Sequence, residues 1–101
     1  SIDYFLQKSP VAVRNREKSK LSMSVFPNPV DEKAQITWNG FPGNPGFLSL
    51  FSASGQLQWT REVDLSAPNL ELDASKLPSG TYFLVLQDRS GSRSTVSFIR
   101  R

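Results

Sequence analysis

The 101-residue chain carries a net charge of +3 and contains neither cysteine nor histidine, which excludes disulfides, thiol nucleophiles, histidine bases and the usual zinc sites. Residues 1–20 hold five basic and two acidic side chains, whereas residues 21–101 hold seven of each. The net positive charge therefore belongs to the N-terminal segment, and its basic residues lack the interleaved aromatic side chains that would indicate a nucleic-acid binder. No apolar run approaches the roughly 20 residues that a transmembrane helix needs.

Residues 1–20 are predicted to be a linker or the tail of a preceding domain. Residues 10–20 are polar, basic and without periodicity, which is typical of a solvated tether. The short apolar patch from Ile2 to Leu6 could be the last strand of that preceding domain or a segment that becomes ordered on contact. We place the boundary at Leu21, so that a single domain spans residues 21–101.

From Leu21 onward the hydrophobic period is two, which is typical of strands with one buried face. Gly/Pro-rich breaks separate the strands at residues 39–46 and 66–69, and residues 53–55 and 89–91 have the composition of hairpin tips. A single helical turn could form at residues 74–77. The pattern predicts an all-β, seven-stranded antiparallel Ig-like sandwich. Its strands should centre on Met23–Val25, Ile36–Trp38, Leu48–Leu50, Leu57–Trp59, Leu70–Leu72, Tyr82–Leu86 and Val96–Phe98, and its core should contain Ile36, Trp38, Leu48, Leu50, Tyr82, Leu84 and Leu86.

Two short phrases stand out against this background. In Phe26-Pro27-Asn28-Pro29-Val30 the two prolines fix their own φ angles and push Asn28 toward extended geometry, which ends a strand and sets the direction of the next segment. In Leu77-Pro78-Ser79-Gly80-Thr81-Tyr82 the glycine tolerates unusual backbone angles. The tyrosine at the start of a buried strand can direct its hydroxyl to a nearby carbonyl. A structural role explains each phrase taken alone.

In chain order, the two phrases, the turn ending at Gly55 and a basic last strand together resemble the type A C-terminal sorting domain of the bacterial type IX secretion system. The resemblance covers essentially all of residues 21–101. The positions that match the sorting motif are Pro27, Asn28, Pro29, Gly55, Leu77, Gly80 and Tyr82. The last segment corresponds to the basic tail of the family and implies recognition by the secretion machinery through Val96, Phe98, Ile99, Arg100 and Arg101.

The resemblance implies a non-enzymatic signal from Bacteroidota that directs attached cargo from the periplasm across the outer membrane, to the cell surface or the medium. The implied partners are the type IX translocon and a sortase-like peptidase, which removes the domain and attaches the cargo to anionic lipopolysaccharide. The linker has no obvious small-residue cleavage site, and Ser9, Ala12 and Ser19 are the candidates for processing. A retained, uncleaved docking module of a surface component of the machinery is the alternative.

Strand order suggests how recognition works. A last strand at a sheet edge leaves backbone groups unpaired, so a receptor, or a second copy of the chain, could add a strand there. Arg93, Arg100 and Arg101 would steer the strand toward an acidic or phosphate-bearing partner. We therefore expect deletion of Phe98–Arg101 to abolish sorting without unfolding the rest.

Other functional classes find less support in the residues. Glu71 and Asp73 share one strand face and could be taken for an acid–base pair, but the alternation places that face toward solvent. Neither a metal nor a cofactor is expected, because no calcium loop or phosphate-binding loop is present. A carbohydrate- or lipopolysaccharide-binding module could use Trp38 and Trp59, although both are in phase with core positions, and Phe41 and Phe47 would be better placed.

Overall fold

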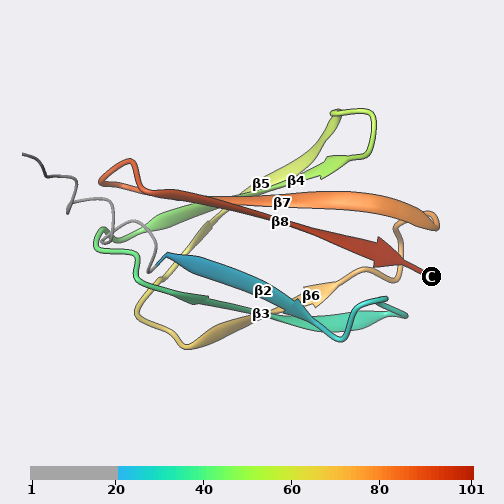
Figure 1. Cartoon of the computed structure of the whole chain (residues 1–101), viewed down its shortest axis with the longest axis horizontal. Helices are drawn as coiled ribbons and strands as arrows, with labels where there is room; N and C mark the ends of the chain where they lie inside the picture. Colours follow the sequence, from blue (N-terminus) through green and yellow to red (C-terminus); the bar gives the residue numbers. More distant parts are fainter. Residues whose placement is uncertain (1–20) are drawn as a thin grey trace, which may run out of the picture.

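Two antiparallel sheets packed face to face make up residues 21–101, the part of the chain that the computed structural model describes (Figure 1). The three-stranded sheet has the order β2 (Ser22–Phe26), β3 (Lys33–Asn39), β6 (Asn69–Asp73). The four-stranded sheet has the order β5 (Leu57–Val63), β4 (Gly46–Ser52), β7 (Gly80–Asp88), β8 (Arg93–Arg100). The predicted seven-stranded all-β sandwich is confirmed. Within these residues no helix is long and apolar enough to cross a membrane.

The core lies between the sheets because alternate residues of each strand point inward. Met23, Val25, Ile36 and Leu72 come from the three-stranded sheet and pack against the buried side chains of the other. Six of the seven predicted core residues are buried, and the seventh, Trp38, is half-buried at the margin of the core. The largest side chains that are fully buried are Phe98, Ile36, Leu48, Leu50, Leu84, Leu86 and Val30.

Strand β5 departs from the predicted alternation. Leu57 was expected to share the inner face with Trp59, but its side chain is 52% exposed. The register of β4 against β5 shifts between Leu50, which pairs with Trp59, and Phe51, which pairs with Leu57. The extra residue, Gln58, makes a β-bulge, and the bulge turns Leu57 to the outer face beside Phe51.

The connections gather at two ends of the sandwich. Residues 27–32, 53–56 and 74–79 and the last residues of β8 lie at one end, which we call the tail end (Figure 1). Residues 40–45, 64–68 and 89–92 lie at the other, which we call the loop end. Residues 74–77, where a single helical turn was expected, form one hydrogen-bonded turn in which the Leu77 N–H donates to the Ala74 carbonyl at 3.0 Å.

Asp88 ties the loop end together. Its side chain is only 3% exposed. One carboxylate oxygen accepts the Gly43 N–H at 2.8 Å, and the other accepts the Ser90 N–H, the Ser90 hydroxyl and the Ser92 N–H at 2.7–2.9 Å. Burial raises the pKa of Asp88, but these hydrogen bonds outweigh it and lower the pKa overall. The buried carboxylate is therefore held in its charged form and joins the loop after β3 to the β7–β8 hairpin.

Candidate functional site

The positions that match the sorting motif assemble at the tail end. Pro27, Asn28 and Pro29 follow β2. Leu77 precedes β7, and Gly80 and Tyr82 lie in its first three residues. The register places Tyr82 beside both Ser52 and Phe98, so the ends of β4 and β8 lie alongside them. Gly55 sits at the tip of the β4–β5 hairpin with φ 89°, toward the same end. Segments far apart in the sequence thus lie at the same end of the sandwich.

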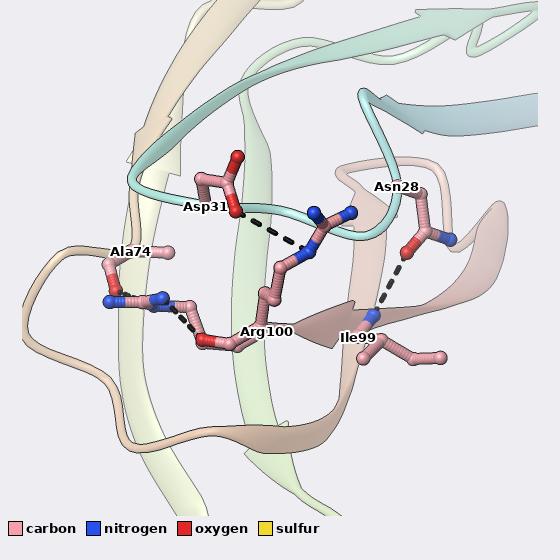
Figure 2. Close-up of polar contacts among 6 residues, drawn as sticks. Asn28, Asp31, Ala74, Ile99 and Arg100 are labelled. Carbon is pink, nitrogen blue, oxygen red and sulfur yellow. Dashed lines mark hydrogen bonds and ion pairs between the residues drawn. The ribbon is translucent and has the colours of Figure 1, made fainter.

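The segment Asn28–Val30 clamps the end of β8 (Figure 2). The Asn28 Oδ1 accepts the Ile99 N–H at 2.9 Å. The Val30 N–H donates to the Ile99 carbonyl at 2.7 Å, and the Arg101 N–H donates to the Val30 carbonyl at 2.9 Å. Because β7 pairs with β8 on its other side, the end of β8 is enclosed by backbone partners on both sides. We call this arrangement the tail clamp.

Arg100 fixes the tail to the loop before β7. Its Nε donates to the Ala74 carbonyl at 2.7 Å, and Nη2 donates to the Ser75 carbonyl at 3.3 Å. The remaining nitrogen, Nη1, donates to the Arg101 carbonyl at 2.7 Å. Ala74 itself donates its N–H to the Glu32 carbonyl at 2.7 Å, so the loop and the segment after β2 are also joined. The planar guanidinium supplies several fixed donors, and all three of its nitrogens are engaged here.

Tyr82 anchors the second phrase, Leu77–Tyr82, to the core. Its hydroxyl donates to the Pro78 carbonyl at 2.7 Å, as expected from the sequence. The ring is buried and stacks on Phe98 with 5.6 Å between the ring centres. Gly80, which pairs with Arg100, has a φ of 152°, a value that residues with a side chain rarely adopt. The phrase therefore sets the geometry of the strand against which the tail lies.

The residues expected to meet the machinery divide by exposure. Phe98 is 1% exposed and Val96 is half-buried, so both serve the fold. Ile99 is 50% exposed, and Arg101 forms a solvent-accessible ion pair with Asp31 at 3.5 Å. The burial of Phe98 argues against the expectation that Phe98–Arg101 could be deleted without unfolding the rest, because that deletion removes the largest fully buried side chain.

The last strand lies at a sheet edge, as predicted, but part of that edge is already paired within the chain. β8 is an edge strand of the four-stranded sheet, yet its last residues are paired with Asn28–Val30. The N–H and C=O of Ile99 point to this edge. Backbone groups of alternate residues point the same way, so those of Thr95 and Ser97 also point to it. The part of β8 that remains open to strand addition therefore precedes the tail. The three arginines do not form one patch, since Arg93 begins β8 about 24 Å from Arg100 at the usual rise per residue.

The aromatic residues considered for sugar binding are largely engaged elsewhere. Trp38 donates its indole N–H to the Leu65 carbonyl at 3.2 Å, and Trp59 packs against the core with the Arg61 guanidinium 4.5 Å above its ring centre. Core packing was predicted for both. Phe41 also packs against the core, whereas Phe47 is exposed on the outer face of β4.

The two carboxylates considered for acid–base chemistry lie on the solvent face, as predicted. Glu71 pairs with Lys33 at 3.7 Å, and both side chains are more than half exposed. Asp73 accepts the Ser75 N–H at 3.0 Å, and this hydrogen bond lowers the pKa of its carboxyl. A lowered pKa and open exposure favour a permanently charged surface group over a proton donor.

Several participants were not predicted from the sequence. Asp31, Ala74 and Ser75 hold the tail, but two of them act through backbone carbonyls, which leave no trace in residue type. The role of Asp88 had a local signal, since an Asp followed by serines two and four positions later favours a side-chain-capped turn. The linker assigned to residues 1–20, with Ser9, Ala12 and Ser19, lies outside the described residues.

Comparison with known proteins identifies the family of the chain. A protein-family model described as "Secretion system C-terminal sorting domain" matches residues 24–100. The match begins in β2 and ends in the last residue of β8, so it contains the whole tail clamp except Arg101. No curated protein sequence matches the chain.

Proposed function

The chain belongs to the family of secretion system C-terminal sorting domains, and from this premise we propose that the type IX machinery reads it at the tail end of the sandwich. As a type IX (Por) sorting domain it directs the export of attached cargo, and it is not an enzyme. Export through this system leads to the cell surface or to secretion.

The observation that carries the proposal is the convergence of the motif and the tail on one surface. Asn28 and Val30 form hydrogen bonds with Ile99 and Arg101 on one side of the tail, and Gly80–Tyr82 pair with Phe98–Arg100 on the other. The preorganised tail then presents Ile99 and the Arg101–Asp31 pair to solvent. A receptor gains affinity from a ligand that is already ordered, because no ordering cost remains at binding.

The proposal extends to the partners and to processing. The translocon would engage the tail end, and a sortase-like peptidase would then cleave before residue 21 and transfer the cargo to anionic lipopolysaccharide. The exposed Arg101 supports an acidic or phosphate-bearing partner. A domain that stays uncleaved would instead serve as a docking module at the cell surface.

A transplant experiment tests the function. Residues 1–101 are fused behind a periplasm-directed reporter in a Bacteroidota host, and the reporter is followed in type IX-competent and type IX-deficient strains. Surface or medium arrival only in the competent strain is expected, and the mass of the reporter shows whether the domain was removed. A folded fusion retained in the periplasm of both strains would refute an autonomous signal.

The site is tested by exchanging one charge. Arg101→Glu should lower export several-fold, because it places two like charges together at residues 31 and 101 and reverses the charge offered to a receptor. Arg89→Glu is the matched control, since this exposed arginine lies at the loop end. Both variants should keep the urea midpoint of the parent. Equal export of the two variants would place the recognition surface elsewhere on the domain.

A further inference from the structure

The outer face of the four-stranded sheet is unusually apolar for a solvent-facing surface. Among the described residues, five large apolar side chains are well exposed, and four of them lie on this face: Leu57, Phe47, Phe83 and Ile99. The half-buried Phe51 and Val85 stand between them. Patches of this kind on small domains mark protein–protein contacts.

The strand register arranges the face in rows that cross the sheet. One row reads Leu57, Phe51, Phe83, Ser97 from β5 to β8, and the next reads Thr60, Ser49, Val85, Thr95. A third row reads Glu62, Phe47, Gln87, Arg93. Within these paired rows of the described chain, only Glu62 and Arg93 are charged. They have opposite signs and stand at opposite edges of the same row.

We propose that a second copy of this chain packs on this face, about a two-fold axis that runs parallel to the strands. Such an axis exchanges the two edges of the sheet but keeps each row at its own height. Glu62 of each copy then meets the partner's Arg93, and Phe51 meets the partner's Phe83. A two-fold axis across the strands would instead bring Arg93 against the partner's Ile99 and leave both charges without counterparts, which disfavours it.

The size of the face places the pair among small interfaces. Four strands spaced by about 4.8 Å and about seven residues long give roughly 500 Å² of flat surface per copy. Burial of roughly 1,000 Å² in total lies at the low end for specific complexes, where partners exchange readily. The pair should therefore form at micromolar or higher concentrations and dissociate on dilution.

The three paired rows end before the tail clamp, so Asn28–Val30 and the Arg101–Asp31 pair lie outside them, and only Ile99, at the margin of the packed face, belongs to both surfaces. Because the axis follows the strands, both tail ends lie at the same end of the pair. If the proposed function holds, a pair presents two recognition sites side by side and gains avidity from the second. Self-association itself does not depend on that function and is measured on the purified chain, so the two proposals can fail separately.

Sedimentation velocity of the whole 101-residue chain, from about 1 µM to about 1 mM, tests the proposal at low and at high salt. A concentration-dependent monomer–dimer equilibrium is expected. Glu62→Arg and Arg93→Glu should each weaken the dimer about tenfold, and the double variant should regain the parent's affinity. Phe83→Ser should weaken the dimer more strongly, whereas Phe26→Ser, on the other sheet and 75% exposed, should leave it unchanged.

Three results would overturn the proposal. The first is a chain that stays monomeric over the whole range, with the circular dichroism of a folded β protein. The second is a dimer that is indifferent to the Glu62 and Arg93 exchanges. The third is a dimer abolished by Thr95→Pro but not by Phe83→Ser, because it would show pairing through the open edge of β8.

Discussion

Asn28 illustrates how one side chain can join two distant segments. Its amide oxygen accepts the backbone N–H of Ile99, 71 positions later in the chain. The two flanking prolines restrict the backbone on either side of Asn28, so less conformational entropy is lost when its side chain takes up this position. The residue is exposed, and its contribution is to the position of the tail more than to the core.

Removal of that oxygen should free the tail locally. In Asn28→Ala the amide of Ile99 should exchange with solvent much faster, while amides in the middle of the β7–β8 ladder keep their protection. The loss in unfolding free energy should be about 1 kcal/mol or less. Asn28→Asp retains an acceptor and should restore protection, and Asn69→Ala serves as the control. An unchanged exchange rate at Ile99 would show that the Val30 bonds hold the tail unaided.

The two parts of Tyr82 contribute separately. Tyr82→Phe removes only the hydrogen bond to Pro78 and should cost about 1 kcal/mol of unfolding free energy. Tyr82→Ala also empties the space beside Phe98 and should cost about 3 kcal/mol. Urea unfolding measures both. If the two variants lost equal stability, the ring would add little to the core. Because Tyr82→Ala is expected to destabilise the fold, loss of export in that variant would not demonstrate contact with a receptor.

At the scale of elements, the loop end depends on a close approach between two loops. A Cβ on Gly43 would lie 2.8 Å from the Ser90 backbone nitrogen and 3.2 Å from the Asp88 carboxyl carbon. The three atoms nearest to a Cβ on Gly46 would all belong to the side chain of Leu65, at 2.8–3.1 Å. A leucine side chain can rotate away, whereas backbone held by a buried carboxylate cannot.

Gly43→Ala should therefore be the more damaging of two otherwise equal substitutions. We expect a loss of about 2 kcal/mol for Gly43→Ala and less for Gly46→Ala, measured by urea unfolding. The first should also raise amide exchange at Ser90 and Ser92. Equal losses, or a larger one at Gly46, would mean that the loop after β3 shifts freely with its new side chain.

The elements themselves were largely predictable, because period-two alternation reports burial on one face directly. Six of the seven strands follow it, from Met23 and Val25 in β2 to Phe98 in β8. In β5 a single extra residue, Gln58, reversed the face of Leu57, and nothing in the local sequence marks a bulge there. Bulges are set by the partner strand, which a single sequence does not identify.

The candidate site was predictable in its residues but not in its contacts. Composition and order indicated the two phrases and the basic tail, and Tyr82 was expected to donate to a carbonyl. The clamp between Asn28–Val30 and Ile99 joins segments about 70 positions apart through backbone atoms, which every residue type possesses. Residue identity therefore carried no signal for that pairing, nor for the carbonyls that hold Arg100.

At the scale of the whole molecule, acid should destabilise the fold through its aspartates. The pKa values of Asp64, Asp73 and Asp88 are lowered from 3.8 in the folded state, Asp64 mainly by the side chain of Ser66 and Asp73 by the backbone of Ser75. A lowered folded-state pKa stabilises the fold above the unfolded pKa, and the stabilisation is lost as the pH falls through the folded value. The urea midpoint should thus be level above about pH 5 and fall below about pH 4.

Asp88→Asn should flatten that acid dependence and lower stability at neutral pH. The amide nitrogen of asparagine would face the Gly43 N–H, donor against donor, and leave a buried group unsatisfied at a cost of about 1–3 kcal/mol. Asp73→Asn, on the surface, should change both quantities less. An acid slope in Asp88→Asn as steep as in the parent would assign the effect to the other carboxylates.

If the machinery reads the tail end as proposed, the tail clamp also makes the export signal depend on folding. Its two halves, Asn28–Val30 and Ile99–Arg101, lie more than 60 residues apart in the sequence and meet only in the folded sandwich. Under that proposal, neither a nascent fragment that stops before Ile99 nor an unfolded polypeptide presents the signal. A receptor for the assembled surface would then accept only folded molecules, and the bonds that fix the tail would act as a checkpoint on folding.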